Sequence, residues 1–239
     1  MKALILAGGR GKRLDERSIE TNKCMIPIKG QPVIEYSLNC ATHTAGIDDI
    51  IIVVGYRAEE IINTYGTRYK NKKIKYVIQW ERKGLVHAIE CAKEAIDGED
   101  FMLLLGDEVL VNPRHQAMLD EFQKNDFFII CGVLTVEDQD LIKRTYTLIH
   151  DANHTIYRLV EKPRHPFNKF MGTGDCVFRN SIFNYIDLTP IHHERQEKEL
   201  PDLIQCAIDD GKTVKSFIIC DRYSNINSED DIQRAESIF

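Results

Sequence analysis

Three glycines and a group of basic side chains are concentrated near the start of the chain, directly after the apolar run 3–5. Residues 6–14 read LAGGRGKRL, and Lys23 follows shortly afterwards. Glycine allows backbone N–H groups to approach an anion closely and to form a concave anion-binding nest. Such a loop either holds a phosphate or makes only a tight turn, and its own residues favour neither interpretation.

The spacing in this loop differs from the two commonest nucleotide-binding motifs. Residues 11–13 are Gly-Lys-Arg, whereas a P-loop has Ser or Thr after its lysine. Leu14 stands where a dinucleotide fingerprint places its third glycine, and the run 53–56 (VVGY) has no carboxylate for a ribose. Any phosphate site here therefore belongs to another class.

Further charged residues follow other predicted strands. Asp107 follows the run 103–106 (LLLG), and Glu161 and Lys162 follow the apolar segment 155–160. A carboxylate at the carboxyl end of a buried strand either caps a loop or binds a hard cation such as Mg²⁺, which takes one or two carboxylates together with phosphate oxygens. Basic residues aimed at one polyphosphate suit a reaction that accumulates negative charge.

The elements that must position these residues are alternating strands and helices. Continuous apolar runs, rather than strict alternation, predict strands buried on both faces of a parallel sheet. Strands are expected over 3–6, 49–54, 74–78 and 101–105, with helices over 32–45, 58–65 and 85–96. This order predicts a doubly wound α/β fold with a mostly parallel, Rossmann-like sheet.

The rhythm changes after residue 112. A helix is expected over 114–124 and a long strand over 127–136, followed by strands over 146–150, 155–160 and 173–178. Since helices are missing between some of these strands, antiparallel additions that form a separate lobe are expected. A helix over 200–207, a strand over 214–219 and a helix over 229–238 complete the chain.

Composition excludes several classes of protein. The 239 residues carry a net charge of −6, and no basic run typical of a nucleic-acid binder occurs. The seven cysteines are scattered without a CxxC pair, which argues against a disulfide framework and a structural zinc site. No apolar stretch is long enough for a membrane span, and no signal peptide is recognisable. A cytoplasmic protein is therefore expected.

Taken together, these segments resemble the sugar-1-phosphate nucleotidyltransferases, and among them most of all the glucose-1-phosphate thymidylyltransferases, short forms included. The loop 6–14 with Lys23 and Pro27 resembles their LAGGxGTRL…K…P signature. Further likenesses follow in register over nearly the whole chain: GLVHAI (84–89), LGD (105–107), EKP (161–163) and ELPDLIQ (199–205). One such motif is weak evidence, whereas five in order are specific.

The resemblance implies the reaction NTP + sugar 1-phosphate → NDP-sugar + pyrophosphate, with Mg²⁺ as cofactor and a pyrimidine nucleotide, dTTP or UTP. The chain has no Gly/Ser linker, repeat or low-complexity tract, so a single domain is expected over 1–239, with a nucleotide-binding part over about 1–112 and a sugar-phosphate-binding part over about 113–239. A homo-oligomer is compatible with the resemblance. The implied catalytic residues are Arg13, Lys23, Asp107 and Lys162. The implied nucleotide-binding residues are Leu6, Ala7, Gly8, Gly9, Gly11, Gln79, Gly84 and Leu85. The implied sugar-phosphate-binding residues are Tyr146, Glu161, Lys162, Thr173 and Gly174. The implied metal ligands are Asp107 and Asn225.

The chain departs from the family pattern at several positions. Asn225 stands where thymidylyltransferases have a second metal-binding Asp, and its amide oxygen is a neutral ligand. Asp175 replaces an apolar residue, and strand alternation places it in solvent unless it meets a cationic group on the sugar. Two alternatives therefore stay open: a cytidylyltransferase that acts on a non-sugar phosphate, and a catalytically silent regulatory homologue.

Overall fold

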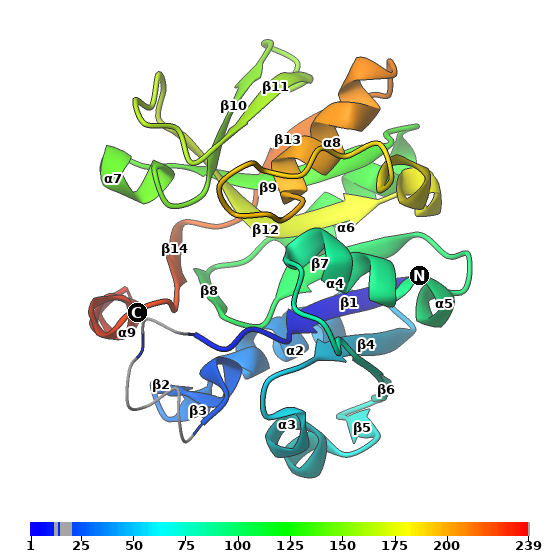
Figure 1. Cartoon of the computed structure of the whole chain (residues 1–239), viewed down its shortest axis with the longest axis vertical. Helices are drawn as coiled ribbons and strands as arrows, with labels where there is room; N and C mark the ends of the chain where they lie inside the picture. The colour runs from blue at the N-terminus through cyan, green and yellow to red at the C-terminus, as the bar shows by residue number, and fades with distance from the viewer. Residues whose placement is uncertain (12–13, 15–20, 239) are drawn as a thin grey trace.

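The structure, a computed structural model, describes residues 1–11, 14 and 21–238. Its centre is a large mixed sheet with the order β11-β10-β12-β7-β1-β4-β6-β5, and β9 and β13 extend it beside β12 (Figure 1). The strands β1 (Lys2–Ala7), β4 (Asp49–Val54), β6 (Lys72–Ile78) and β7 (Phe101–Leu105) are mutually parallel. The α/β fold with a mostly parallel core sheet is thus confirmed.

Helices cover both faces of this parallel part. The connections contain α2 (Ile34–His43), α3 (Ala58–Tyr65), α4 (Leu85–Cys91) and α5 (Lys93–Ile96). Along β1, Ala3 and Ile5 pack into one core cluster with α2, whereas Leu4 packs into a second cluster with α4. The continuous apolar run predicted this two-sided burial. The expected single helix over 85–96 is interrupted at Ala92.

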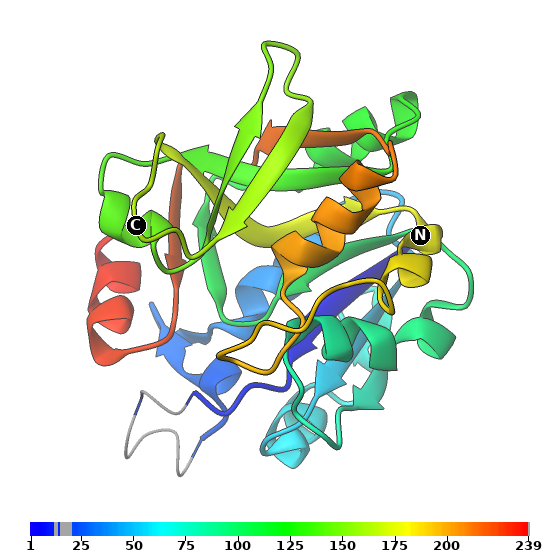
Figure 2. The ribbon, with the colours of Figure 1, turned by 45° about the horizontal axis from the view of Figure 1, so that its top comes forward.

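The second half adds mainly antiparallel strands, as expected. These are β9 (Ile129–Thr135), β10 (Tyr146–His150), β11 (Ile156–Glu161) and β12 (Phe170–Phe178), with β13 (Val214–Ile218) parallel to β9. Remaining helices are α6 (His115–Lys124), α7 (Gln139–Ile142), η3 (Asn180–Tyr185), α8 (Leu200–Asp209) and α9 (Glu229–Ser237). Figure 2 shows α8 (orange) beside the β10–β11 hairpin, and Gln205 of α8 accepts a hydrogen bond from Leu159 N at 3.0 Å.

Several short elements lay outside the sequence expectations. They are η2 (Lys23–Met25), β2 (Pro27–Ile28), β3 (Gln31–Pro32), β5 (Arg68–Tyr69), β8 (Glu108–Val111) and β14 (Arg222–Asn225). The antiparallel pair β8–β14 matters most, because it sets Asn225 opposite Glu108, the residue after Asp107. Distant segments of the chain thereby reach one edge of the sheet.

The sheet reverses its direction of winding between β1 and β7. The chain runs from β1 outward through β4 to β6 and then returns to β7 on the other side of β1. In open α/β sheets, ligands bind outside the carboxyl ends of strands at such a reversal. The loop after β1 holds the glycines and the loop after β7 holds Asp107. Among the described residues, no helix is long and apolar enough to cross a bilayer.

Candidate active site

Two neighbouring cavities open at this reversal point. The first, here called the glycine-loop cavity, has a volume of about 590 Å³. The residues that define it are Leu6, Gly8, Gly9, Arg10, Gly11, Lys23, Cys24, Gln79, Arg82, Gly84, Leu85, Ala88, Leu105, Asp107 and Glu197. All of the described residues assigned to the nucleotide line this cavity except Ala7, which is buried in the core. Arg13 lies outside the described residues.

The second cavity, here called the Glu161 cavity, has a volume of about 240 Å³. Its wall includes every residue assigned to the sugar phosphate, together with Asn225, Asn227, Glu108 and Glu199. These assigned residues are Tyr146, Glu161, Lys162, Thr173 and Gly174. Leu85 and Leu105 line both cavities, so the two share a wall.

Lys23 lies where the two cavities meet. Its Nζ forms an ion pair with Asp107 Oδ2 in the glycine-loop cavity and donates to Asn227 Oδ1, 3.2 Å away, in the Glu161 cavity. The side chains of Lys23 and Asp107 are 12% and 13% exposed. Burial alone would lower the pKa of Lys23, but the Asp107 carboxylate overrides this effect and raises it. Lys23 therefore stays cationic at neutral pH.

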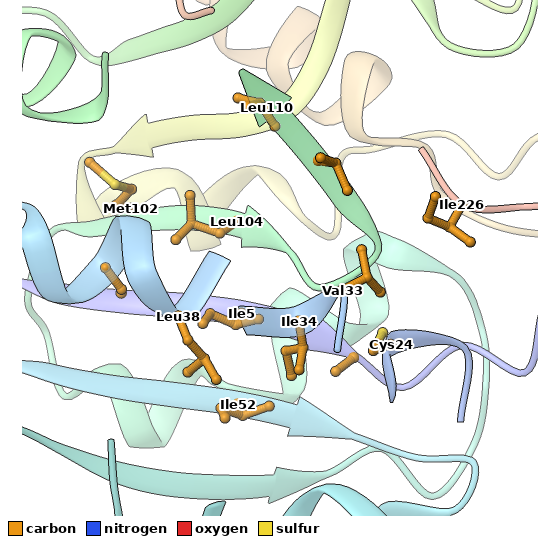
Figure 3. Packing of buried hydrophobic residues seen from close by; sticks show 14 of the residues in the cluster. Ile5, Cys24, Val33, Ile34, Leu38, Ile52, Met102, Leu104, Leu110 and Ile226 are labelled. Carbon is orange, nitrogen blue, oxygen red and sulfur yellow. The ribbon is translucent and has the colours of Figure 1, made fainter. Parts of the chain in front are cut away.

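Local structure holds Lys23 in this position. Asn22 is fully buried and caps η2, because its side-chain oxygen accepts a hydrogen bond from Cys24 N at 2.8 Å. The Asn22 amide nitrogen donates to Tyr56 O at 2.6 Å, which ties η2 to the end of β4. Cys24 and Ile226, the neighbours of the two interacting residues Lys23 and Asn227, belong to the apolar core (Figure 3). Buried apolar neighbours thus fix the positions of Lys23 and Asn227, which form the hydrogen bond.

A polar chain continues from Lys23 to the predicted metal ligand. Asn227 Nδ2 donates to Asn225 Oδ1 at 2.6 Å, and Asn225 Nδ2 donates to Glu108 Oε1 at 3.4 Å. Ile226 N donates to Asp107 O at 2.9 Å, so the backbone of this strand end is joined to the Asp107 loop. One carboxylate and one amide oxygen are hard ligands that suit Mg²⁺ when phosphate oxygens supply further positions. The described residues contain no cluster of three or more His, Cys, Asp or Glu side chains suited to a metal.

Glu108 is a central residue that the sequence reasoning missed. It accepts hydrogen bonds from Tyr223 Oη at 2.6 Å and from Gly174 N at 3.1 Å. Burial, followed by the neighbouring carboxylates of Asp175 and Asp107, raises the pKa of Glu108 well above its usual value. Asn227 was also missed. It lies two residues after Asn225, and in an extended segment residues at this spacing point to the same face, so the spacing was a usable signal.

The strand β12 is irregular where it passes the Glu161 cavity. Its pairing with β9 is interrupted between Gly172 and Cys176, and this irregularity turns Gly174 N toward Glu108. Asp175 does not face solvent, contrary to the expectation, because His115 at the start of α6 packs against it. It is 2% exposed and bonds His115 Nε2 at 2.7 Å, away from the Glu161 cavity. An interaction of Asp175 with a sugar group is therefore also ruled out in this arrangement.

Buried polar groups without partners mark the Glu161 cavity and its rim. Tyr146 Oη and Arg195 Nη2 have no hydrogen-bond partner in the described part of the chain. Arg195 pairs with Glu199 and lies 4.0 Å from Glu161, and Lys162 Nζ lies 3.0 Å from Glu161 Oε1. Buried polar groups normally find a partner. Tyr146 Oη and Arg195 Nη2 are therefore candidates to contact a polar ligand.

Gln79, which the resemblance assigns to the base of the nucleotide, lies in the wall of the glycine-loop cavity. Its Nε2 contacts Gly84 O at 3.1 Å and His87 Nδ1 at 3.0 Å. Gly84 begins α4 with φ of +91°, a conformation that L side chains rarely adopt, and an added Cβ would lie 2.6 Å from Glu197 Oε2. Trp80, the neighbour of Gln79, is 84% exposed and therefore does not cover the core.

A glycine substitution tests the packing of the Glu161 cavity. A Cβ at Gly172 would lie 1.9 Å from Cζ of Tyr146, so Gly172→Ala must displace that ring. We expect a loss of about 1–3 kcal/mol in unfolding free energy, and a rise in KM for the sugar phosphate that exceeds the rise for the nucleotide. Thermal melts measure the loss of stability, and steady-state kinetics measure the two KM values. Adding Tyr146→Leu should restore stability but not sugar-phosphate affinity; equal effects on both KM values would contradict this placement.

Fold and site together define a nucleotidyltransferase. A family model described as nucleotidyl transferase matches residues 2–226, and the chain belongs to this family. It is 30% identical over 236 residues to UTP–glucose-1-phosphate uridylyltransferase AglF of Haloferax volcanii, with 99% of this chain and 95% of that protein covered. It is 28% identical to the low-salt glycan biosynthesis nucleotidyltransferase Agl11 of the same organism, covering 100% of this chain but 66% of that protein.

Solved structures show the same fold. A UDP-glucose pyrophosphorylase complexed with UDP-glucose superposes with a TM-score of 0.88 at 21% identity, over 99% of this chain and 97% of that chain. The resemblance drawn from the motifs of residues 6–14, 84–89, 105–107, 161–163 and 199–205 is therefore confirmed.

Proposed function

We propose that the protein transfers a nucleotidyl group from a nucleoside triphosphate, dTTP or UTP, to a sugar 1-phosphate and releases pyrophosphate. The observation that carries the proposal is the position of Lys23 between two cavities with different linings. One cavity offers glycine backbone and Gln79, which suit a nucleotide, and the other offers carboxylates, a lysine and buried hydroxyl groups, which suit a sugar phosphate. AglF, named as a uridylyltransferase of glucose 1-phosphate, supports the substrate class.

In this proposal the reaction needs no protein base. The nucleophile is an oxygen of the sugar phosphate, which already carries negative charge near neutral pH because the second pKa of a phosphate monoester is about 6. A bond forms from this oxygen to the α-phosphorus as the bond to the β-phosphate oxygen breaks, and pyrophosphate leaves. Lys23 would contact the α-phosphate from one side and the sugar phosphate from the other. Positioning and charge neutralisation then supply the catalysis.

The other residues would divide between the two substrates. Gly8, Gly9 and Gly11 would bind phosphates through backbone N–H groups, while Gln79 would bond the base. Lys162 and Glu161 would hold the sugar phosphate and the sugar hydroxyls.

Asp107 and Asn225 would hold Mg²⁺, which would neutralise phosphate charge when bound. Arg13 would neutralise the departing pyrophosphate, an assignment that depends on the sequence alone.

A substrate panel tests the proposal. The protein is mixed with each of five NTPs and with several sugar 1-phosphates, phosphocholine and an inositol phosphate, and released pyrophosphate is measured. We expect turnover with dTTP or UTP and a sugar 1-phosphate, and mass spectrometry should identify the NDP-sugar. Turnover with CTP and a non-sugar phosphate would favour the cytidylyltransferase alternative, and nucleotide binding without turnover of any pair would indicate a silent homologue.

A further inference from the structure

Two arginines share one aromatic ring at the glycine-loop cavity. The guanidinium carbons of Arg10 and Arg82 lie 5.4 Å and 6.0 Å from the centre of the Tyr56 ring. Arg10 belongs to the loop after β1, whereas Arg82 belongs to the connection between β6 and α4, and both line the cavity. Two segments that are distant in the sequence thus bring a cation to the same place.

Arg10 and Arg82 differ from the neighbouring Lys83 in their charge partners. Within residues 1–11, 14 and 21–238, neither guanidinium forms an ion pair, whereas the adjacent Lys83 is paired with Glu81. Each guanidinium is attracted by the face of the neutral ring, but the two repel each other. A multiply charged anion between them would remove the repulsion and accept hydrogen bonds from both, since guanidinium groups match phosphate oxygens in a bidentate manner.

Tyr56 is fixed relative to the glycine loop. Its backbone N donates to Gly8 O at 3.2 Å, and its backbone O accepts from Asn22 Nδ2 at 2.6 Å. Arg82 lies in the connection that also carries Gln79 and Gly84, and all three residues line the glycine-loop cavity. An anion held by both guanidinium groups would therefore lie in the glycine-loop cavity with Gly8 and Gly9, away from the Glu161 cavity.

We propose that Arg10 and Arg82 clamp the terminal phosphates of the bound nucleoside triphosphate beside Tyr56. This inference depends on the proposed function and adds to it two residues that select a triphosphate over a monophosphate. Because the contacts are to the β- and γ-phosphates, the pyrophosphate keeps them until it leaves. The NDP-sugar product would not make them, because its second phosphate comes from the sugar 1-phosphate.

Binding measurements without the second substrate isolate this contribution. The variants are Arg10→Gln, Arg82→Gln and the double variant, with Lys83→Gln as matched control, since Lys83 is adjacent, exposed and outside the cavity lining. Titration calorimetry measures UTP, UMP and inorganic tripolyphosphate. Each single variant should weaken UTP and tripolyphosphate binding about tenfold and UMP binding less than twofold, with Lys83→Gln close to wild type.

The outcomes separate the clamp from the proposed function. If the wild type binds UTP, and the double variant binds UTP and tripolyphosphate as tightly as the wild type does, the clamp is overturned and the proposed function stands. An equal loss in Lys83→Gln, or an equal loss for UMP, also overturns it, because a general electrostatic field would then explain the effect. A wild-type protein that binds neither UTP nor dTTP would contradict both proposals.

Discussion

Replacing Lys23 by methionine is expected to lower kcat about a thousandfold, while nucleotide and sugar-phosphate affinities change far less. Loss of one preorganised donor to the charge that develops in a transition state costs about 10²–10³ in kcat, and Lys23 is placed to contact both reacting phosphates. Methionine retains the apolar stem and volume of the side chain. Steady-state kinetics with each substrate in turn, at saturating concentration of the other, measure the effect.

Stability gives this prediction a second readout. Lys23 and Asp107 are largely buried, and removal of one member of a buried ion pair leaves the other uncompensated. Lys23→Met should therefore lower the unfolding free energy, by about 3–5 kcal/mol. The double variant Lys23→Met/Asp107→Asn removes both charges and should regain stability without regaining turnover. If Lys23→Met kept near-normal turnover, the role assigned to Lys23 would be wrong.

Replacing Asp107 by asparagine is the second large effect expected. The amide keeps the shape of the side chain but removes the charge that would neutralise Mg²⁺ and that now pairs with Lys23. We expect kcat/KM to fall by about 10³ or more and the Mg²⁺ concentration for half-maximal rate to rise. Activity is titrated with MgCl₂ at fixed substrate, and binding of Mn²⁺ to the protein–nucleotide complex is followed by electron paramagnetic resonance.

Asn225→Asp is the matched control for the metal assignment. It places a carboxylate where the resembling thymidylyltransferases have one, so it should lower the Mg²⁺ requirement while Asp107→Asn raises it. Asn225 lies 3.4 Å from Glu108 and the new charge joins an acidic cluster, so a small loss of stability should accompany the change. Metal titrations that coincide for wild type and both variants would refute Asp107 and Asn225 as ligands.

The strands and the site loops were predictable because their signals are local. The apolar run of β4, Asp49–Val54, reports burial on both faces, and the glycines of residues 8–11 mark a tight loop after the first strand. The pattern therefore placed Asp107 at the carboxyl end of a strand, next to the glycine loop. The order of the strands around β1 then brings these two loops together.

The contacts between distant segments were not predictable in the same way. The β8–β14 pair joins segments more than a hundred residues apart and sets Asn225 against Glu108, but each strand alone is only four residues long. Asp175 looked like a solvent-facing residue by alternation, and the sheet and His115 bury it. The β8–β14 pairing and the burial of Asp175 depend on contacts between distant segments, which the alternation of residues along one strand does not reveal.

A structure of the protein with Mg²⁺, the α,β-methylene analogue of dTTP or UTP and a sugar 1-phosphate tests the central claim most directly. Our account predicts that Lys23 Nζ leaves Asp107 and lies within hydrogen-bonding distance of both the α-phosphate and the sugar phosphate. The nucleotide would occupy the glycine-loop cavity and the sugar the Glu161 cavity. Lys23 still paired with Asp107 while both ligands are bound elsewhere would contradict the account.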